Sequence, residues 1–397
     1  ILYTISKILL VICIIFVFGT MNVFGFAKNQ IVVSSLIEEE YVDASTANLI
    51  FPEKKQNLIY IYLESMENTF SSIENGGIYV EDRIPELVKI ANENINFSNT
   101  NKLGGALNLE GTQWTIAAMV SQTAGIPLKI SIDGNEYGKH ESFLPGAYTL
   151  GEVLEENGYT NYLLLGSESE FGGRKLYFEA HGNYKIWDYN SAIEENKRQE
   201  SERVWWGYSD NDLFEYAKEQ LTKISKNDEP FNYTMLTVDT HFTDGYFCED
   251  CEYEYSDVYS NVIRCSSKKV SDFVKWIKEQ PFYENTTIII SGDHLTMQAS
   301  TEEQFKKAQG EERSIYNAII NAKVEPVKTT NREFFTFDMY PTTLAALGVQ
   351  IEGDRLGLGT NLFSSRQTLA EQYGVEYVRK ETKKKSTFYN KKLLYGE

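Results

Sequence analysis

The chain has 397 residues, which is enough for one large α/β domain or two medium ones. Its formal charge at pH 7 is −19, from 57 acidic and 38 basic residues. Such an acidic balance argues against non-specific nucleic-acid binding, which needs basic patches. The 26 Tyr, 22 Phe and only 8 Pro are typical of a folded chain rather than a disordered one. We therefore expect a folded protein with no nucleic-acid partner.

The first feature along the chain is an uncharged apolar segment at residues 8–26. At about 1.5 Å per residue a helix of this length nearly crosses a bilayer core. A cleaved signal peptide has a shorter apolar core, about 7 to 15 residues, and a small-residue cleavage site. We therefore predict a transmembrane segment at 1–27, a connecting stalk at 28–56, a catalytic domain at 57–365 and a peripheral tail at 366–397. Because the first residue is Ile1 and not Met, we also expect the natural chain to begin further upstream.

Short apolar runs alternate with helical patterns in the rest of the chain. The runs are at 57–63, 161–165, 233–238 and 286–290, with a weaker one at 318–320. Runs this continuous are typical of strands that are buried on both faces. Residues 114–124, 150–157, 212–225 and 260–279 have helical character, mostly through apolar residues three or four apart. The alternation predicts an α/β fold with a mostly parallel sheet flanked by helices.

Polar residues follow each of the four longer runs. Glu64 and Ser65 follow the first, residues 166–168 the second, residues 239–241 the third and residues 291–294 the fourth. In open α/β sheets, ligands bind beyond the carboxyl ends of the strands. Asp and Ser are ordinary turn residues, so only their joint occurrence predicts a site. Carboxylates of Glu64 and Asp293 with the imidazole of His294 are suited to Mn²⁺, Mg²⁺ or Zn²⁺.

A threonine near the start of the predicted helix at 114–124 is the candidate nucleophile. Thr112 lies in the sequence GTQWT, which places it at or next to the helix N-terminus. Free N–H groups and the helix dipole favour an anion such as phosphate there. Metal coordination can activate a threonine hydroxyl. A simple N-cap explains Thr112 equally well, and Thr115 is the alternative nucleophile.

Cys248, Cys251 and Cys265 form a cluster in the sequence. A metal site would need a fourth ligand, which is not evident nearby. A disulfide needs an oxidising compartment, which a domain outside the membrane has. We expect one disulfide in this loop and one remaining thiol.

The segments NLIYIYLES, GTQWTIAAM, Asp239-Thr240-His241 and SGDH together resemble the alkaline phosphatase/sulfatase superfamily. Within it, their order is most similar to the phosphoglycerol transferases, which include lipoteichoic acid synthase. The resemblance extends over about residues 50–365. It implies one divalent metal, Mn²⁺ before Mg²⁺ or Zn²⁺, with the ligands Glu64, Thr112, Asp293 and His294. It also implies that Thr112 is the nucleophile and that His241 and Arg174 bind substrate; Lys175 and His181 are alternatives to Arg174.

The resemblance further implies the reaction. Phosphoglycerol would pass from phosphatidylglycerol to Thr112, with release of diacylglycerol, and then to a glycan or glycolipid acceptor. The enzyme would belong to the cell membrane, with its catalytic domain extracellular or periplasmic. Gly172 replaces an aromatic residue of lipoteichoic acid synthase, so substrate contacts should differ. The alternatives are a phosphoethanolamine transferase, a phosphodiesterase or sulfatase-like hydrolase, and a non-catalytic membrane-tethered binding protein. Sulfatases need a C/S-x-P-x-R nucleophile sequence, and no Cys lies at that position here.

Overall fold

The computed structural model describes residues 31–130, 142–310 and 312–397, together with a few residues before residue 30. Most of the apolar segment 8–26, and with it the predicted transmembrane helix, lies outside the described residues. Within the described part of the chain, no helix is both long and apolar enough to cross a bilayer.

The centre of the protein is a six-stranded sheet with the strand order β5-β4-β6-β2-β7-β9. All neighbouring strands are parallel except β7 and β9, which are antiparallel. The prediction of a mostly parallel sheet is confirmed. Its strands are β2 (Asn57–Leu63), β4 (Thr160–Leu165), β5 (Lys185–Trp187), β6 (Phe231–Leu236), β7 (Thr286–Gly292) and β9 (Asn317–Ile320).

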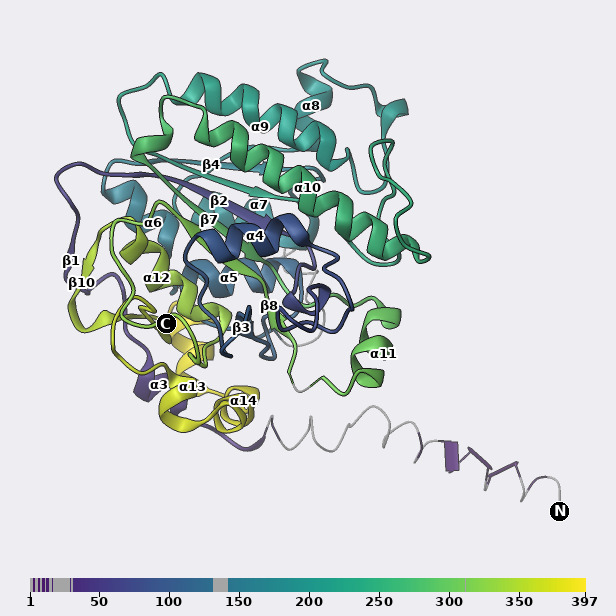
Figure 1. Cartoon of the computed structure of the whole chain (residues 1–397). Coiled ribbons are helices and arrows are strands. Elements are labelled where there is room, and N and C mark those ends of the chain that lie inside the picture. The colour runs from purple at the N-terminus through teal and green to yellow at the C-terminus, as the bar shows by residue number, and fades with distance from the viewer. Residues whose placement is uncertain are drawn as a thin grey trace.

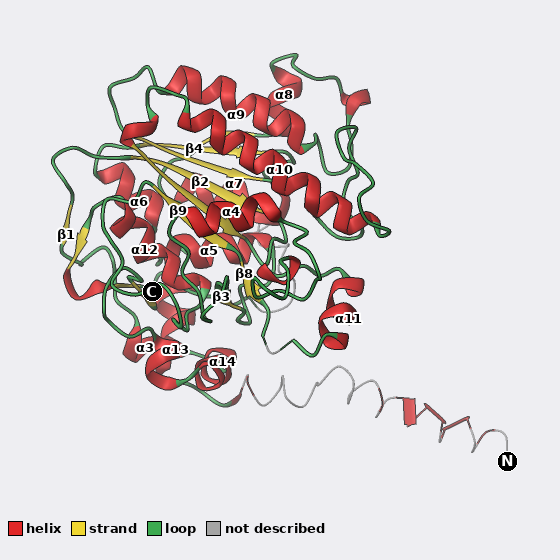
Figure 2. Cartoon of the chain, in the orientation of Figure 1, coloured by secondary structure: helices red, strands yellow, loops and turns green. Residues whose placement is uncertain are grey.

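Helices cover both faces of this sheet (Figures 1 and 2). Leu58, Tyr60 and Tyr62 of β2 join one buried core, and the alternate residues Ile59 and Ile61 join another, because successive side chains of a strand point to opposite faces. The first core includes α5 (Thr115–Ala124), α6 (Leu150–Glu156), α7 (Arg174–Ala180) and α12 (Met339–Ala346). The second includes α4 (Pro85–Glu93), α8 (Tyr189–Glu194), α9 (Asp210–Ile224) and α10 (Val258–Lys278).

The described residues just before the central sheet pack directly on the domain. In the segment that we expected to be a connecting stalk, Leu36 and Ile37 of α3 (Leu36–Glu40) are buried in the first core. The Glu40 carboxylate accepts a hydrogen bond of 2.6 Å from Arg355. Strand β1 (Leu49–Ile50) pairs with β10 (Gln350–Ile351). The described part of 28–56 is therefore attached to the domain along much of its length.

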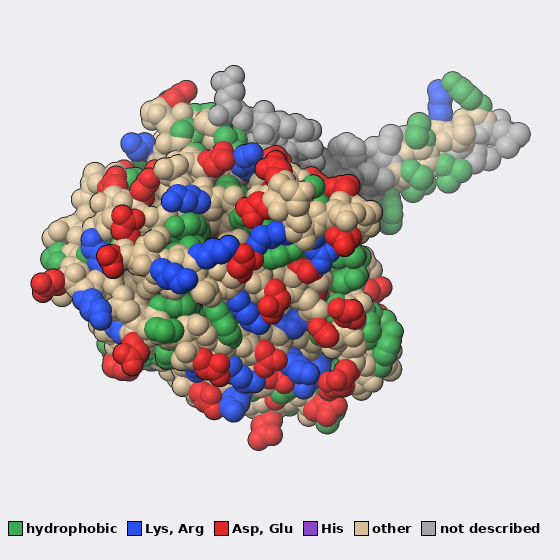
Figure 3. Space-filling view, turned by 90° about the horizontal axis from the view of Figure 1, so that it is seen from above, with side chains coloured by type: hydrophobic (Ala, Val, Ile, Leu, Met, Phe, Trp, Pro, Cys, Tyr) green, Lys and Arg blue, Asp and Glu red, His purple; other side chains and the backbone are tan. Residues whose placement is uncertain are grey.

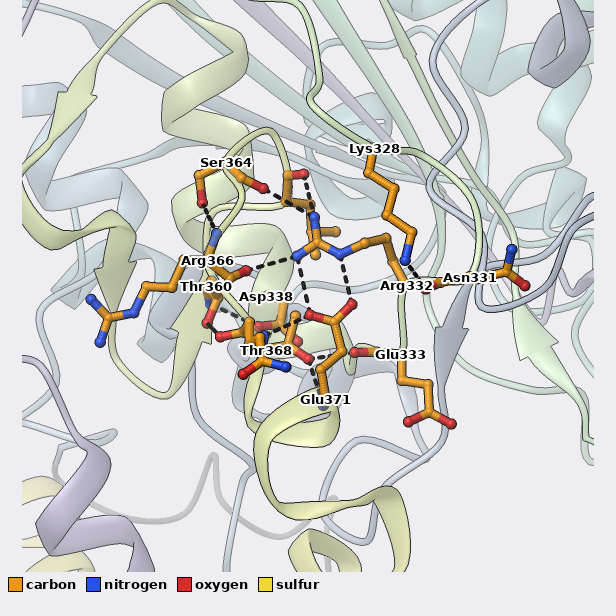
Figure 4. A network of polar contacts seen from close by, with 12 residues as sticks. Lys328, Asn331, Arg332, Glu333, Asp338, Thr360, Ser364, Arg366, Thr368 and Glu371 are labelled. Carbon is orange, nitrogen blue, oxygen red and sulfur yellow. Dashed lines mark hydrogen bonds and ion pairs between the residues drawn. The ribbon is translucent and has the colours of Figure 1, made fainter.

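The last segment is also attached more closely than the peripheral tail that we expected. Arg332 is 3% exposed and donates to the Glu371 carboxylate and to the backbone carbonyls of residues 362, 364 and 366 (Figure 4). Glu371 belongs to α13 (Leu369–Tyr373), which is followed by α14 (Val375–Lys383). Side chains of this segment, Leu369, Val378, Tyr389 and Leu393, are buried in the first core. Residues 366–393 are thus part of the domain's packing.

The remaining α-helix and strands are short. They are β3 (Ala106–Leu107), α11 (Ala299–Lys307), β8 (Ser314–Ile315), β11 (Arg355–Leu356) and β12 (Gly359–Thr360). Strand β3 pairs with β8, and β11 with β12. On the face seen in Figure 3, acidic and basic side chains are interspersed rather than gathered by sign.

Candidate active site

The register of the parallel strands brings the predicted site residues together. Leu63 of β2 pairs with Gly292 of β7, so that Glu64 and Asp293 leave neighbouring strands at the same level. Strand β6 lies on the other side of β2 and places the loop that begins at Thr237 beside Glu64. The backbone N–H of Glu64 donates to the Thr237 hydroxyl at 3.0 Å, and the Thr240 hydroxyl donates to the Glu64 carbonyl. Three strands therefore fix the position of Glu64.

Glu64, Asp293 and His294 form a compact buried group. Their exposures are 2%, 0% and 1%. Nε2 of His294 lies 3.5 Å from Oε1 of Glu64 and 3.4 Å from Oδ2 of Asp293. Nδ1 of His294 lies 2.9 Å from the Leu295 carbonyl, to which it donates in the tautomer that leaves Nε2 free to face the carboxylates. All three ligand atoms lie within 4.8 Å of one another, as a single metal ion would require.

The electrostatics of this group fit a cation. Burial, and then the charge of Glu64, raises the pKa of Asp293 to about 8. Burial opposes protonation of His294, but the charges of Asp293 and Glu64 outweigh it and raise its pKa. Oδ2 of Asp293 is buried and accepts no hydrogen bond from the described residues. A divalent metal would neutralise the charge of these two buried carboxylates and would give Oδ2 of Asp293 a partner.

The turn after β2 holds these carboxylates in place through hydrogen bonds from its backbone and side chain. Ser65 has a φ of 55°, which is unusual for a residue other than glycine and is often seen at functional sites. Its backbone N–H donates to Oδ1 of Asp293 at 2.8 Å, and its hydroxyl donates to Oε1 of Glu64 at 2.8 Å. The N–H of His294 also donates to Oδ1 of Asp293, at 2.7 Å. Ser65 thus links the ends of β2 and β7.

The two candidate threonines occupy different positions. Thr115 is the first residue of α5, and its hydroxyl lies 3.2 Å from Oε2 of Glu64. Thr112 lies before the helix, is fully buried, and its hydroxyl donates to the Leu109 carbonyl at 2.9 Å. The turn there needs Gly111, whose φ is +86° and where a Cβ would approach the Leu128 carbonyl to 2.8 Å. The helix therefore begins three residues later than Thr112, and the structure brings Thr115 to the carboxylates.

A cavity of about 130 Å³ opens beside Glu64. Its walls include Thr115, Arg174, Arg203, Trp206 and His241. The ring of His241 packs against that of Trp206, with centroids 5.0 Å apart. The wall presents two guanidinium groups and an imidazole next to a hydroxyl. These groups are suited to bind an anionic ester.

Arg174 is a buried member of this wall. Its guanidinium donates to the Ser167 hydroxyl at 3.0 Å and to the Glu168 carbonyl at 2.7 Å. Burial lowers its pKa to about 10, although the charge of Glu64 opposes this change. Both bonds come from the loop that follows β4. The arginine is thus oriented by the strand end that the sequence had marked as part of the site.

The two alternatives to Arg174 lie elsewhere. His181 is buried, with Nε2 2.7 Å from the Phe143 carbonyl and Nδ1 3.1 Å from Glu152. His181 therefore contributes to packing in the first core. Lys175 is exposed and pairs with Glu170 at 3.2 Å.

Two residues of the cavity wall were not anticipated from the sequence. Arg203 pairs with Glu168 at 2.7 Å, and Trp206 follows it in the loop between α8 and α9. The signal that could have identified them is the sequence RVWW in an otherwise polar stretch, because Trp and Arg are enriched where proteins bind their partners.

Comparison with known proteins shows the family of the chain. Residues 56–349 match the sulfatase family profile. The chain belongs to the sulfatase family. Proteins similar to it include phosphoglycerol transferase I of Escherichia fergusonii, 31% identical over 330 residues, and that of Shigella flexneri, 32% identical over 330 residues. Each alignment covers 81% of this chain and 40% of the relative, so the chain spans less than half the length of these relatives.

Solved structures share the fold of this sulfatase-family chain. An alkaline phosphatase superfamily protein of Vibrio parahaemolyticus has a TM-score of 0.60 and 19% identity, over 85% of this chain and 79% of that one. The lipoteichoic acid synthase LtaP of Listeria monocytogenes also has a TM-score of 0.60, with 18% identity over 84% and 82% of the two chains. The resemblance predicted from the sequence is confirmed by the family profile and the phosphoglycerol transferase relatives, and these structures share the fold.

Proposed function

We propose that this chain is the catalytic part of a metal-dependent phosphoglycerol transferase that uses Thr115 as its nucleophile. The observation that supports it most is the hydroxyl of Thr115, which lies at a helix N-terminus, 3.2 Å from a metal-type carboxylate and on the wall of a cavity lined by arginines. The similarity to phosphoglycerol transferase I supports phosphoglycerol as the group transferred. Thr112, the nucleophile that we expected, is less suited because its hydroxyl is engaged with the Leu109 carbonyl.

The metal ligands of the proposal are Glu64, Asp293, His294 and, in place of Thr112, Thr115. A divalent cation held by them would supply positive charge that activates a hydroxyl and neutralises phosphoryl oxygens. Mn²⁺ or Mg²⁺ is suited to the two carboxylates, and Zn²⁺ to the imidazole as well.

The protein's own groups define the two transfer steps. In the first, Thr115 gives up its hydroxyl proton to solvent through Glu64, which accepts its hydrogen bond, and its oxygen forms a bond to phosphorus. The bond from phosphorus to the diacylglycerol oxygen breaks, and that oxygen leaves with a proton, for which His241 is the nearby donor. In the second step an acceptor hydroxyl gives its proton to His241 and attacks phosphorus, and the oxygen of Thr115 leaves and regains a proton from solvent. Arg174 and Arg203 would bind the phosphoryl oxygens, because guanidinium groups match their geometry.

The proposal places the donor, phosphatidylglycerol, in a membrane and the acceptor, a glycan or glycolipid, outside it. The catalytic domain would therefore face the outer side of the cell membrane. A formylglycine-type sulfatase is a weaker alternative, because residue 115 is Thr and the residues after it, IAAM, lack the C/S-x-P-x-R sequence.

The test uses the full chain with Mn²⁺ and vesicles that contain phosphatidylglycerol labelled in its headgroup. We expect diacylglycerol to be released and, without acceptor, a phosphoglycerol adduct on the peptide that contains Thr115. Mass spectrometry distinguishes this adduct from phosphoethanolamine when phosphatidylethanolamine is supplied instead. Absence of diacylglycerol from folded, metal-loaded protein would refute the proposal.

A further inference from the structure

A second group of metal-type ligands lies apart from the candidate active site. Cys248, Cys251 and Cys265 are 4%, 8% and 7% exposed, and all three are thiols. The disulfide that we expected here is not formed. Cys248 and Cys251 lie in the loop between β6 and α10, and Cys265 lies within α10, so the group joins this loop to the helix that directly follows it.

The distances between the sulfur atoms suit a shared ion. The Cys248 sulfur lies 3.3 Å from that of Cys251 and 3.9 Å from that of Cys265. The ligand atoms of all three residues lie within 4.8 Å of one another. A zinc–thiolate bond of about 2.3 Å in a tetrahedron puts neighbouring sulfurs about 3.8 Å apart. A disulfide would join one pair at about 2.0 Å and exclude the third sulfur. The three thiols are thus arranged as one face of a tetrahedron.

A lysine next to the three sulfur atoms also supports a bound cation. Nζ of Lys269 lies 3.1 Å from the Cys248 sulfur and 3.0 Å from Oδ2 of Asp239. Three thiolates around a dication leave one negative charge, which this ammonium group would balance. Hydrogen bonds to ligand atoms from such outer residues also orient metal ligands in other proteins.

From these contacts we propose that Cys248, Cys251 and Cys265 bind one thiophilic divalent cation of the Zn²⁺ type. Among the described residues the group contains no fourth His, Cys or carboxylate, so a solvent molecule would complete the tetrahedron. Binding releases the thiol protons to solvent, as metal–thiolate formation requires.

The role of this site is structural. The ion would hold the loop 239–257 against α10, across a sequence separation of 17 residues between Cys248 and Cys265. Asp239, which pairs with Lys269, stands two residues before His241. The metal would thus stabilise the loop that presents His241 to the cavity. This structural site does not depend on the phosphoglycerol transfer proposed for the other site.

The test titrates the reduced, metal-free full chain with Co²⁺, whose bonds to thiolates give a near-ultraviolet charge-transfer absorption that oxygen and nitrogen ligands do not give. We expect this absorption to appear, to saturate at one sulfur-bound ion per chain and to be displaced by Zn²⁺. Cys265→Ser should lose it. Cys13→Ser, which changes the chain's remaining cysteine, should keep it, as should Asp293→Asn in the candidate active site.

A second measurement needs no variant and so does not depend on whether Cys265→Ser folds. With Zn²⁺ bound, Cys248, Cys251 and Cys265 should resist alkylation until a chelator is added, while Cys13 reacts at the same rate with and without the metal. The proposal is overturned if the wild-type chain shows no charge-transfer absorption. It is equally overturned if mass spectrometry of the protein as purified finds Cys248 and Cys251 joined as a disulfide.

Discussion

The hydroxyl of Thr115 lies 3.2 Å from Oε2 of Glu64, although the two residues are 51 positions apart in the sequence. The contact joins the first turn of α5 to the end of β2. It places a hydroxyl, a carboxylate and the N-terminal end of a helix dipole at one point, where a phosphoryl group would meet all three.

Thr115→Val should abolish phosphoglycerol transfer. Valine has nearly the shape of threonine but cannot form a phosphoester, so we expect the rate to fall by at least about a thousandfold, as when other enzymes lose their nucleophile. Release of diacylglycerol from labelled phosphatidylglycerol measures the rate. Circular dichroism and Mn²⁺ binding should show that the variant is folded and still binds the cation, more weakly.

Thr112→Val is the matched control. It removes the hydrogen bond to the Leu109 carbonyl, which should cost about 0.5–1.5 kcal/mol of stability. The transfer rate should stay within a few-fold of that of the wild type. If instead Thr112→Val abolished transfer and Thr115→Val retained it, the nucleophile would be Thr112, as the sequence suggested.

Asp293→Asn should weaken binding of Mn²⁺. The change removes a charged ligand, so the affinity should fall by more than the roughly 10- to 100-fold seen when an outer-shell partner is lost. Isothermal calorimetry with Mn²⁺ measures it, and this hard ion discriminates against the cysteine group. Cys251→Ser serves as control and should leave the Mn²⁺ affinity unchanged. Equal affinity of Asp293→Asn and the wild type would contradict the metal site.

Arg313→Gln should destabilise the protein strongly. Glu67 is fully buried, and Arg313 donates to it at 2.8 Å and to the Thr296 carbonyl at 2.8 Å. Removing the arginine leaves a buried carboxylate without its charge partner, which costs about 3–5 kcal/mol. Urea unfolding measures the loss. Lys306→Gln, which breaks an exposed pair with Glu302, should change stability very little, and an equally small effect of Arg313→Gln would disprove the argument.

The pair between Glu86 on α4 and Arg264 on α10 should give a pH-dependent contribution to stability. Burial opposes ionisation of Glu86, but hydrogen bonds from Arg264 and Ser267 outweigh it and hold its pKa below the usual 4.5. A lowered pKa means that the stabilisation is fully present above pH 4.5 and is lost as the pH falls through the folded-state pKa. The difference in unfolding free energy between wild type and Glu86→Gln should therefore shrink below pH 4.5. A difference that stays constant from neutral pH into this range would exclude the linkage.

Much of the fold could be predicted because the buried strands have continuous apolar sequences. The runs at 57–63, 161–165, 233–238 and 286–290 correspond to β2, β4, β6 and β7. Strand β5 was missed because it has only three residues, none of them buried. Its pairing with β4, rather than its composition, makes it a strand.

The candidate site could be predicted only in part. The positions of Glu64, Asp293 and His294 follow from strand ends, which the sequence marks clearly. The choice between Thr112 and Thr115 depends on where α5 begins, and no side-chain cap marks that point. Arg203 and Trp206 reach the cavity from a loop whose path depends on tertiary contacts such as the Arg203–Glu168 pair.

The register of β2 and β7 has a thermodynamic consequence. It brings together the candidate ligands Glu64 and Asp293, which lie far apart in the sequence at the ends of these two strands, so the unfolded chain cannot offer the same set. A cation that binds only the native state stabilises it by mass action, by about 2.7 kcal/mol at a concentration one hundred times its Kd. The melting temperature of the whole domain should therefore rise with the concentration of Mn²⁺, and the supply of this ion would set how much of the protein stays folded.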